Sequence, residues 1–179
     1  MKIELKKIKV YDRMSEETTA FTADVYINGK NVGTAKNDGH GGETDLQFYH
    51  AQGSPLRKLC DEAEVWARTL PDRIIMLGDG QLSIKVELVD LIDDQVDEFL
   101  KNKEVAKREK AGLKQIQWGK PNGGSYHITS WKGLTLADLI KRPNGLMSLQ
   151  TQVNRIKKEF KEGEVFLNEV YLQSLGIKV

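Results

Sequence analysis

The sequence predicts an α+β fold: a small antiparallel sheet of hairpins covered by a helix, then a linking helix and a smaller, mostly helical lobe with one hairpin. Asn28-Gly29 stands between two strand-like runs, which is a strong short-range signal for a hairpin. Apolar residues recur at steps of three and four after Ser54-Pro55, which indicates an amphipathic helix. A later helical pattern loses its apolar residues beyond Lys101, which favours a connection between subdomains. The expected subdomains are 1–89 (sheet and helix), 90–112 (connecting helix) and 113–179 (hairpin and helices, basic).

The first expected strand, residues 2–11, is an edge strand with a bulge. Ile3 and Leu5 lie in one alternating phase, whereas Ile8 and Val10 lie in the other. Because a one-residue slip reverses the faces of a strand, an extra residue between the two halves restores a common apolar face.

The next elements form a hairpin, a helix and a second hairpin. Residues 21–27 alternate apolar and polar side chains and return along 32–36. Ser54 is the expected N-cap of a helix that ends at Leu70-Pro71, with Pro55 at its first position. A second hairpin is expected from 74–77 and 81–88, with Gly78-Asp79-Gly80 as its turn.

The second half of the chain begins with a helix from about Leu91 to Ala111, capped by Asp90 and closed by Gly112. A third hairpin is expected around the turn 119–124. The remaining elements expected are strand-like runs at 116–118 and 126–130 and helices at 134–140, 146–160 and 165–175.

Composition restricts the possible classes of protein. No run of eighteen apolar residues is present, so we expect no transmembrane helix. The N-terminal residues alternate charged and apolar side chains, unlike a signal peptide. The single cysteine, Cys60, lies on the apolar stripe of the first helix, which favours a core residue over a nucleophile. We therefore expect a cytoplasmic protein without disulfides.

The glycine-rich segment 37–45 is the densest group of polar chemistry in the chain. It matches neither the Walker A nor the Rossmann spacing. Its backbone N–H groups can form a nest for phosphate, or its glycines can serve only the turns of a long connection. The candidate ligand- or partner-binding residues are Lys36, Asn37, Asp38, Gly39, His40, Gly41, Gly42, Thr44 and His50.

The same segment contains candidate metal ligands and candidate acid–base residues. Asp38, His40, Glu43, Asp45 and His50 offer oxygen and nitrogen ligands, but their spacing matches no known metal motif, so neither a metal nor a cofactor is predicted. His40 and His50 can also exchange protons in a small nuclease or phosphohydrolase if the fold brings them together.

The C-terminal third is basic, with ten Lys or Arg against five Asp or Glu in residues 114–179. Aromatic residues beside cations can stack on bases while the cations bind phosphates. Ordinary surface lysines and core tryptophans explain the same pattern. The candidate nucleic-acid residues are Lys120, Trp131, Lys132, Lys141 and Arg142.

The segments 15–18, 21–30 and 37–42, together with 156–164, resemble small uncharacterised proteins of bacteriophages and bacterial mobile elements. The resemblance implies no activity, cofactor or catalytic residue. It implies a context in which accessory proteins bind a host factor or sequester a signal. We therefore expect a non-enzymatic binding protein that contacts a host protein or a small phosphorylated ligand, with a role against host defence; a nucleic-acid-binding module and a small hydrolase are the alternatives.

Overall fold

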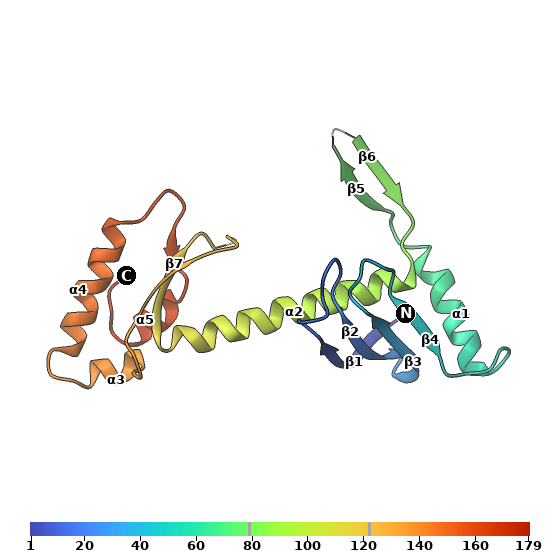
Figure 1. The fold of residues 1–179 in the computed structure, drawn as a ribbon, viewed down its shortest axis with the longest axis horizontal. Coiled ribbons are helices and arrows are strands. Elements are labelled where there is room, and N and C mark those ends of the chain that lie inside the picture. The colour runs from blue at the N-terminus through green and yellow to red at the C-terminus, as the bar shows by residue number, and fades with distance from the viewer. Residues whose placement is uncertain (79, 122) are drawn as a thin grey trace. The chain divides into compact units, whose positions relative to one another are not determined.

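The computed structural model describes residues 1–78, 80–121 and 123–179 and has the expected α+β architecture (Figure 1). Asp79 and Asn122, which we expected in hairpin turns, lie outside the described residues. The sheets have the strand orders β1-β2-β3-β4, β5-β6 and β8-β7-β9, and all pairings are antiparallel. The elements are β1 (Ile3–Val10), β2 (Phe21–Ile27), β3 (Lys30–Asn37), β4 (Asp45–Phe48), α1 (Pro55–Ala67), β5 (Arg73–Leu77), β6 (Gly80–Ile84), α2 (Leu88–Gly112), β7 (Gln115–Gly119), β8 (His127–Ser130), α3 (Leu136–Ile140), α4 (Gly145–Lys158), β9 (Val165–Phe166) and α5 (Glu169–Ser174).

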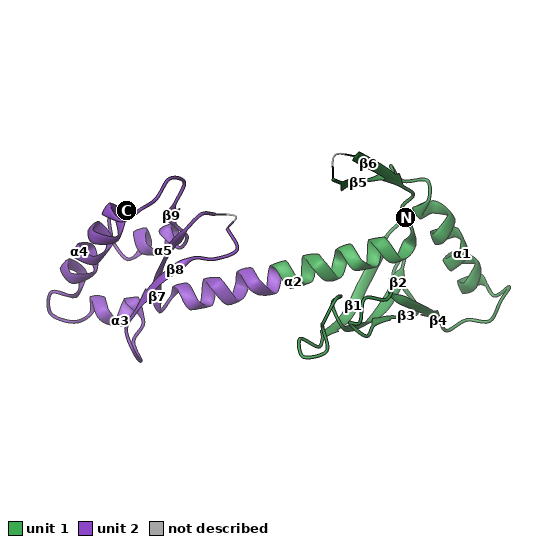
Figure 2. Ribbon diagram, turned by 45° about the horizontal axis from the view of Figure 1, so that its top comes forward, with its two compact units in different colours: residues 1–101 green, residues 102–179 purple. Residues whose placement is uncertain are grey.

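The chain divides into two compact units, which we call unit 1 (residues 1–101) and unit 2 (residues 102–179) (Figure 2). The division falls within α2, between the boundaries expected at 89/90 and 112/113. Each unit has its own apolar core. None of the helices in the described ranges combines the length and apolar composition needed to cross a bilayer.

The bulge expected in the first strand is present. The register with β2 shifts within β1, where Lys7 has a φ of +52°. As a result Ile3, Leu5, Ile8 and Val10 all pack against the core of unit 1, although they occupy opposite phases of the sequence. The extra residue therefore turns both halves of this edge strand toward one face.

The Asn28-Gly29 turn is confirmed, because both residues have positive φ, +49° and +79°. The strand that enters it, β2, buries alternate residues, so one face of the sheet is apolar. Residues of α1 and of the first half of α2, among them Cys60 and Ile92, complete the core. Ser54 caps α1 by accepting a hydrogen bond from the N–H of Arg57 (3.2 Å).

Four expectations for unit 1 are wrong in detail. The connection after Lys36 contains a strand, β4, which its short sequence pattern did not reveal. Hydrogen bonds with β3 stabilise this strand. The second strand of the second hairpin ends at Ile84, and α1 ends at Ala67 instead of Leu70. The linking helix begins at Leu88, because Asp90 accepts a hydrogen bond from the N–H of Glu87 (2.7 Å) and stabilises an earlier start.

In unit 2 the third hairpin is confirmed as β7 and β8. The last expected helix is wrong at its start: Val165 and Phe166 form β9 and pair with β7, and α5 begins only at Glu169. Phe166 is thereby buried in the core of unit 2 together with Ile116 and Val153. Tertiary burial of this aromatic side chain outweighs the helical spacing of the sequence around it.

Candidate functional site

The glycine-rich segment joins β3 to β4 and closes against residues 14–18. The carbonyl of Gly39 accepts hydrogen bonds from the N–H groups of Glu16, Glu17 and Thr18 (3.0, 3.0 and 3.2 Å). Gly39 has a φ of +90°, and a Cβ there would lie 2.1 Å from the carbonyl oxygen of Met14. This position therefore requires glycine for both its conformation and its space.

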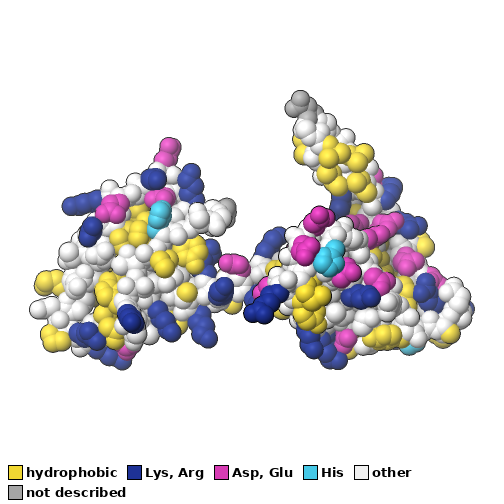
Figure 3. All heavy atoms as spheres, viewed as in Figure 1, with side chains coloured by type: hydrophobic (Ala, Val, Ile, Leu, Met, Phe, Trp, Pro, Cys, Tyr) yellow, Lys and Arg dark blue, Asp and Glu magenta, His cyan; other side chains and the backbone are white. Residues whose placement is uncertain are grey.

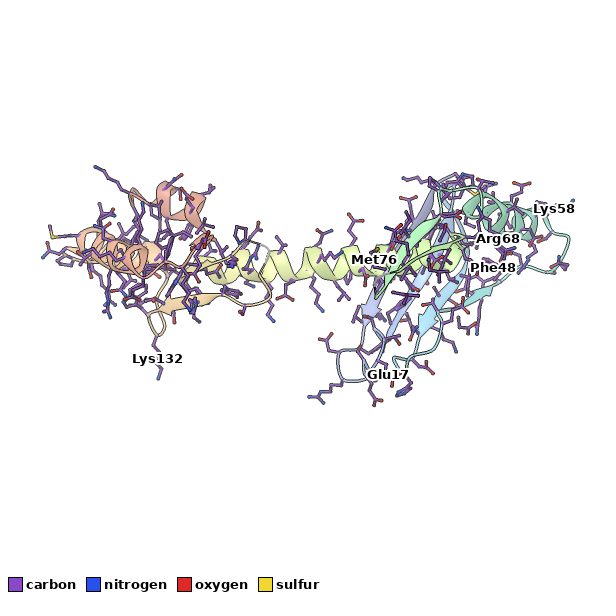
Figure 4. The ribbon with its side chains drawn as sticks, turned by 90° about the horizontal axis from the view of Figure 1, so that it is seen from above. Glu17, Phe48, Lys58, Arg68, Met76 and Lys132 are labelled. Carbon is purple, nitrogen blue, oxygen red and sulfur yellow. The ribbon has the colours of Figure 1, made fainter. Side chains whose placement is uncertain are left out.

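The other two glycines differ from each other. Gly41 has a φ of +85°, and a Cβ there would lie 2.2 Å from Oε2 of Glu17, whose side chain is labelled in Figure 4. A Cβ on Gly42 would meet nothing within 4 Å. Gly39 thus lies against fixed backbone and Gly41 against the end of a flexible side chain, whereas Gly42 leaves open space.

Side-chain oxygens already accept hydrogen bonds from the backbone N–H groups that a phosphate would need. Oδ1 of Asn37 accepts hydrogen bonds from the hydroxyl of Thr18 (2.9 Å) and from the N–H of Gly39 (2.8 Å). The N–H of Gly41 donates to the same Thr18 hydroxyl (3.2 Å), and Nδ2 of Asn37 donates to the carbonyl of Gly42 (2.9 Å). The N–H groups of Gly39 and Gly41 are therefore satisfied within the protein, which weakens the case for an anion nest.

A small cavity of about 200 Å³ lies beside this loop, between Asn37 and Gly42 on one side and Asp93 and Asp97 of α2 on the other. The hydroxyl of the buried Thr44 donates to Oδ1 of Asp93 (2.6 Å). Burial raises the pKa of Asp93; the Thr44 hydrogen bond opposes this rise, and the neighbouring carboxylates of α2 add to it. The cavity is thus acidic and suits a cation or a hydrogen-bond donor better than a phosphate.

The two histidines of the segment lie at opposite ends of the β3–β4 hairpin. Nδ1 of His40 lies 3.2 Å from Oε2 of Glu16, whereas Nε2 of His50 lies 3.5 Å from the carbonyl oxygen of Asn31. Asn31 and Asn37 are six residues apart on β3, which at the rise of a strand is ~20 Å. A shared proton transfer between these histidines has no support in this geometry.

The remaining candidates of this segment are dispersed on the surface. Lys36 pairs with Asp45 across the hairpin (3.5 Å), and Asp38 is exposed. Within the described residues no three His, Cys, Asp or Glu side chains form a group that could hold a metal ion. The structure therefore brings together Asn37, Gly39, Gly41 and Thr44, and separates His50 from them.

The basic residues of unit 2 divide in the same way. Trp131 and Lys132 line a cavity of about 450 Å³ together with Lys114, and the Lys132 side chain extends away from unit 2 (Figure 4). Lys120 follows the opposite end of β7, because Gln115 pairs with Ser130 and Trp118 with His127. This candidate therefore does not lie beside Trp131.

Lys141 and Arg142 follow α3. Asp138 forms a capping box with Thr135, and this hydrogen bonding, with a smaller contribution from the two cations, lowers the pKa of Asp138. Trp131, the tryptophan among these candidates, packs against the core of unit 2, and so does Trp118. This agrees with the interpretation of the tryptophans as core residues.

Two features escaped the sequence analysis. The first is the apolar surface of the β5–β6 hairpin. A strand with one face in water alternates apolar and polar residues, whereas residues 74–77 are four consecutive apolar residues and so indicate two apolar faces. The second is a cavity of about 590 Å³ in unit 2 that includes Gln117 and Asn168. Nothing in the sequence pattern marks it, since its walls come from α2, β7, β9 and α5.

Comparison of the chain with protein-family models, curated proteins and solved structures gives no match.

Proposed function

We propose that the chain is a non-enzymatic binding protein that attaches to another protein through the β5–β6 hairpin of unit 1. The observation that carries this proposal is the exposed apolar surface of a two-stranded sheet with which no other described strand pairs. Large exposed apolar patches are rare on proteins that have no partner. Six apolar side chains of the hairpin have exposed fractions of 39% to 66%: Ile74, Ile75, Met76, Leu77, Leu82 and Ile84.

Both faces of the hairpin are apolar. Ile75 pairs with Leu82, so these residues share a face with Leu77 and Ile84. The opposite face carries the other two apolar residues of β5, including Met76, which is labelled in Figure 4. Figure 3 shows apolar side chains covering the visible side of this hairpin. The outer edges of both strands also offer backbone groups for pairing with a partner strand.

The charges of unit 1 indicate the chemistry of the partner. Unit 1 has 13 Lys or Arg against 19 Asp or Glu, a formal charge of −6. The cations next to the hairpin are paired internally: Arg73 with Asp94, and Lys85 with Asp72 (2.7 Å). The best-fitting partner is therefore a protein with an apolar cleft bordered by Lys and Arg, since opposite charges at the rim speed and orient association.

A host protein is the partner that we propose, in keeping with the resemblance to phage and mobile-element proteins. A phosphorylated ligand at the glycine-rich loop has less support, because Asp93 and Asp97 border the adjacent cavity. The hydrolase alternative has less support too, because His40 and His50 have separate partners.

Native mass spectrometry of the protein purified from cells that encode it tests this function. We expect a stoichiometric protein complex, which is then rebuilt from the purified partner and measured by calorimetry. Leu77→Asp and Leu82→Asp should each weaken the affinity about 30-fold, the effect of losing a 2 kcal/mol contact. Val65→Asp is the matched control, because Val65 is 67% exposed on α1, outside the hairpin. Unchanged affinity of both hairpin variants would refute the proposal.

A second candidate is nucleic-acid binding by unit 2. This unit has 14 Lys or Arg against 7 Asp or Glu, a formal charge of +7, and Lys114, Trp131 and Lys132 border one cavity. Binding of single-stranded RNA should then weaken steeply with salt, and Lys132→Glu should reduce both the affinity and the salt slope. Salt-independent or undetectable binding would remove this candidate.

A further inference from the structure

A cavity of about 590 Å³ lies entirely within unit 2. Its volume falls in the range of small-molecule sites. The walls include the apolar side chains of Leu113, Phe166, Val170 and Tyr171. Leu113 and Val170 are exposed despite being apolar, with exposed fractions of 43% and 82%. The cavity therefore has apolar side chains that a ligand could cover.

One polar side chain of the cavity is almost completely buried and only half satisfied. Gln117 is 1% exposed, and its Nε2 donates to the carbonyl oxygen of Arg108 (3.0 Å). None of the described residues donates a hydrogen bond to its Oε1. Among the described residues, Oδ1 of Asn31 is the fully enclosed side-chain atom that lacks a hydrogen-bond partner. Oε1 of Gln117 also lacks a donor but is not fully enclosed, so it retains some exposure. Oε1 of Gln117 is therefore an acceptor that is available to a donor from outside the described chain.

The amide oxygen of Gln117 lies close to Gly112, another residue that lines the cavity. A Cβ placed on Gly112 would lie 3.7 Å from Oε1 of Gln117, and Gly112 lines the same cavity. The absence of a side chain at Gly112 therefore leaves room beside this acceptor.

The surrounding backbone is fixed by Asn168. Its Nδ2 donates to the carbonyl oxygens of Gly112 and Gln115 (both 2.9 Å), and its Oδ1 accepts from the N–H of Gln117 (3.1 Å). The N–H of Leu167 also donates to the carbonyl of Gln117 (2.8 Å). These bonds hold the acceptor in place before any ligand arrives, which reduces the ordering needed on binding.

We propose that this cavity binds a flat, apolar molecule that carries one N–H or O–H donor, and that the donor reaches Oε1 of Gln117. Predominantly apolar walls with a small number of placed polar groups are typical of small-molecule sites. Arg108, Glu109 and Glu169 also border this cavity. A free heteroaromatic compound and a tryptophan side chain of a peptide share this chemistry. The site is independent of the hairpin, which belongs to unit 1.

Titration of the full chain with indole and with indene tests the proposal by ¹H–¹⁵N spectroscopy. The two molecules have the same shape, but only indole has an N–H donor. Indole should bind saturably and shift the side-chain amide signal of Gln117, and indene should bind at least about tenfold more weakly, as expected for a lost hydrogen bond of about 1.4 kcal/mol. N-acetyltryptophanamide distinguishes the sources: tighter binding than indole indicates a peptide side chain, and weaker binding a free compound.

Three variants provide controls. Gln117→Met should equalise the affinities for indole and indene. Leu113→Asp, at a cavity residue that is 43% exposed, should weaken the affinities for both molecules. This second variant keeps the test valid if the buried substitution at Gln117 unfolds unit 2. Lys132→Ala, in the separate cavity next to Trp131, should change neither. Equal affinity of the wild type for indole and indene, shifts confined to other residues, or no saturable binding of indole would overturn the proposal.

Discussion

Replacement of Gly39 by alanine should destabilise unit 1 far more than the same change at Gly42, three residues along the same loop. A non-glycine residue in the left-handed region costs about 1–2 kcal/mol, and overpacking against fixed atoms adds about 1–3 kcal/mol. At Gly39 both effects operate, because φ is +90° and the new Cβ would lie 2.1 Å from the carbonyl oxygen of Met14. We therefore expect Gly39→Ala to lower the free energy of unfolding of unit 1 by about 3 kcal/mol.

Native-state hydrogen exchange measures this effect separately in the two units. The amides of Val25 and Ile27, which are fully buried on β2, report on unit 1, and those of Leu149 and Val153 on α4 report on unit 2. Loss of 3 kcal/mol should accelerate globally limited exchange on β2 about 150-fold and leave α4 unchanged.

Gly42→Ala is the control, because its Cβ would meet no atom within 4 Å, so exchange on β2 should change little. Equal effects of the two substitutions on β2, or an effect of Gly39→Ala below about 1 kcal/mol, would refute the assignment of Gly39 to a closed contact with residues 14–18.

Four further outcomes are expected. Thr44→Val should lower the stability of unit 1 by about 1–3 kcal/mol, measured by urea unfolding, because the half-buried carboxylate of Asp93 loses its hydroxyl donor; Thr44→Ser, which keeps the hydroxyl, should recover most of it. Burial raises the pKa of the Asp93 carboxyl group in the folded state. The folded state therefore binds the carboxyl proton more tightly than the unfolded state does. As a result the stability of unit 1 falls as pH rises through the raised pKa. Asp93→Asn should consequently raise Tm at pH 7 and have little effect at pH 3; an equal rise at both pH values would contradict this. Gly145→Ala places a Cβ 1.9 Å from a backbone carbonyl oxygen of α3 and should cost unit 2 about 2–3 kcal/mol, whereas Gly124→Ala meets nothing within 4 Å and should be neutral in the same thermal melt. Cys60 is fully buried and burial raises the pKa of its thiol, so iodoacetamide should modify it only as fast as unit 1 opens. Rapid labelling of the native protein would show that α1 does not hold Cys60 against the core of unit 1.

The apolar hairpin shows why a correct element does not by itself reveal a surface. Residues 74–77 and 81–84 were expected as paired strands, and they are paired. The alternation of the sequence predicts a second strand that continues to Leu88 within a sheet covered by a helix. In the structure Val86 and Leu88 are buried in unit 1, whereas Leu82 and Ile84 remain exposed. A strand pattern specifies which residues share a face, but not whether another element covers that face.

The sequence placed the glycine-rich segment after the first hairpin and before the capped helix, but it did not reveal β4, which makes the segment the connection of a second hairpin with β3. The chemistry of the segment was not predictable either. The N–H of Gly41 is satisfied by Thr18, which is twenty-three residues away in the chain and lies beside Gly41 only in the folded unit. Asn37, two residues before Gly39, satisfies the N–H of Gly39 locally. The acidic cavity beside the loop likewise requires Asp93, forty-nine residues beyond Thr44 in the chain.

The sequence by itself determined the local features of this protein: the Asn28-Gly29 turn, the phase change that becomes the bulge of β1, the Ser54 cap and the buried stripe of α1. These depend on backbone preferences and side-chain periodicity within a few residues. Only the tertiary structure decided the pairing of β9 with β7, the acidic cavity beside Asp93 and the half-satisfied amide of Gln117. Each of these depends on contacts between residues distant in the chain, and such contacts follow from how whole elements pack rather than from the residues next to them.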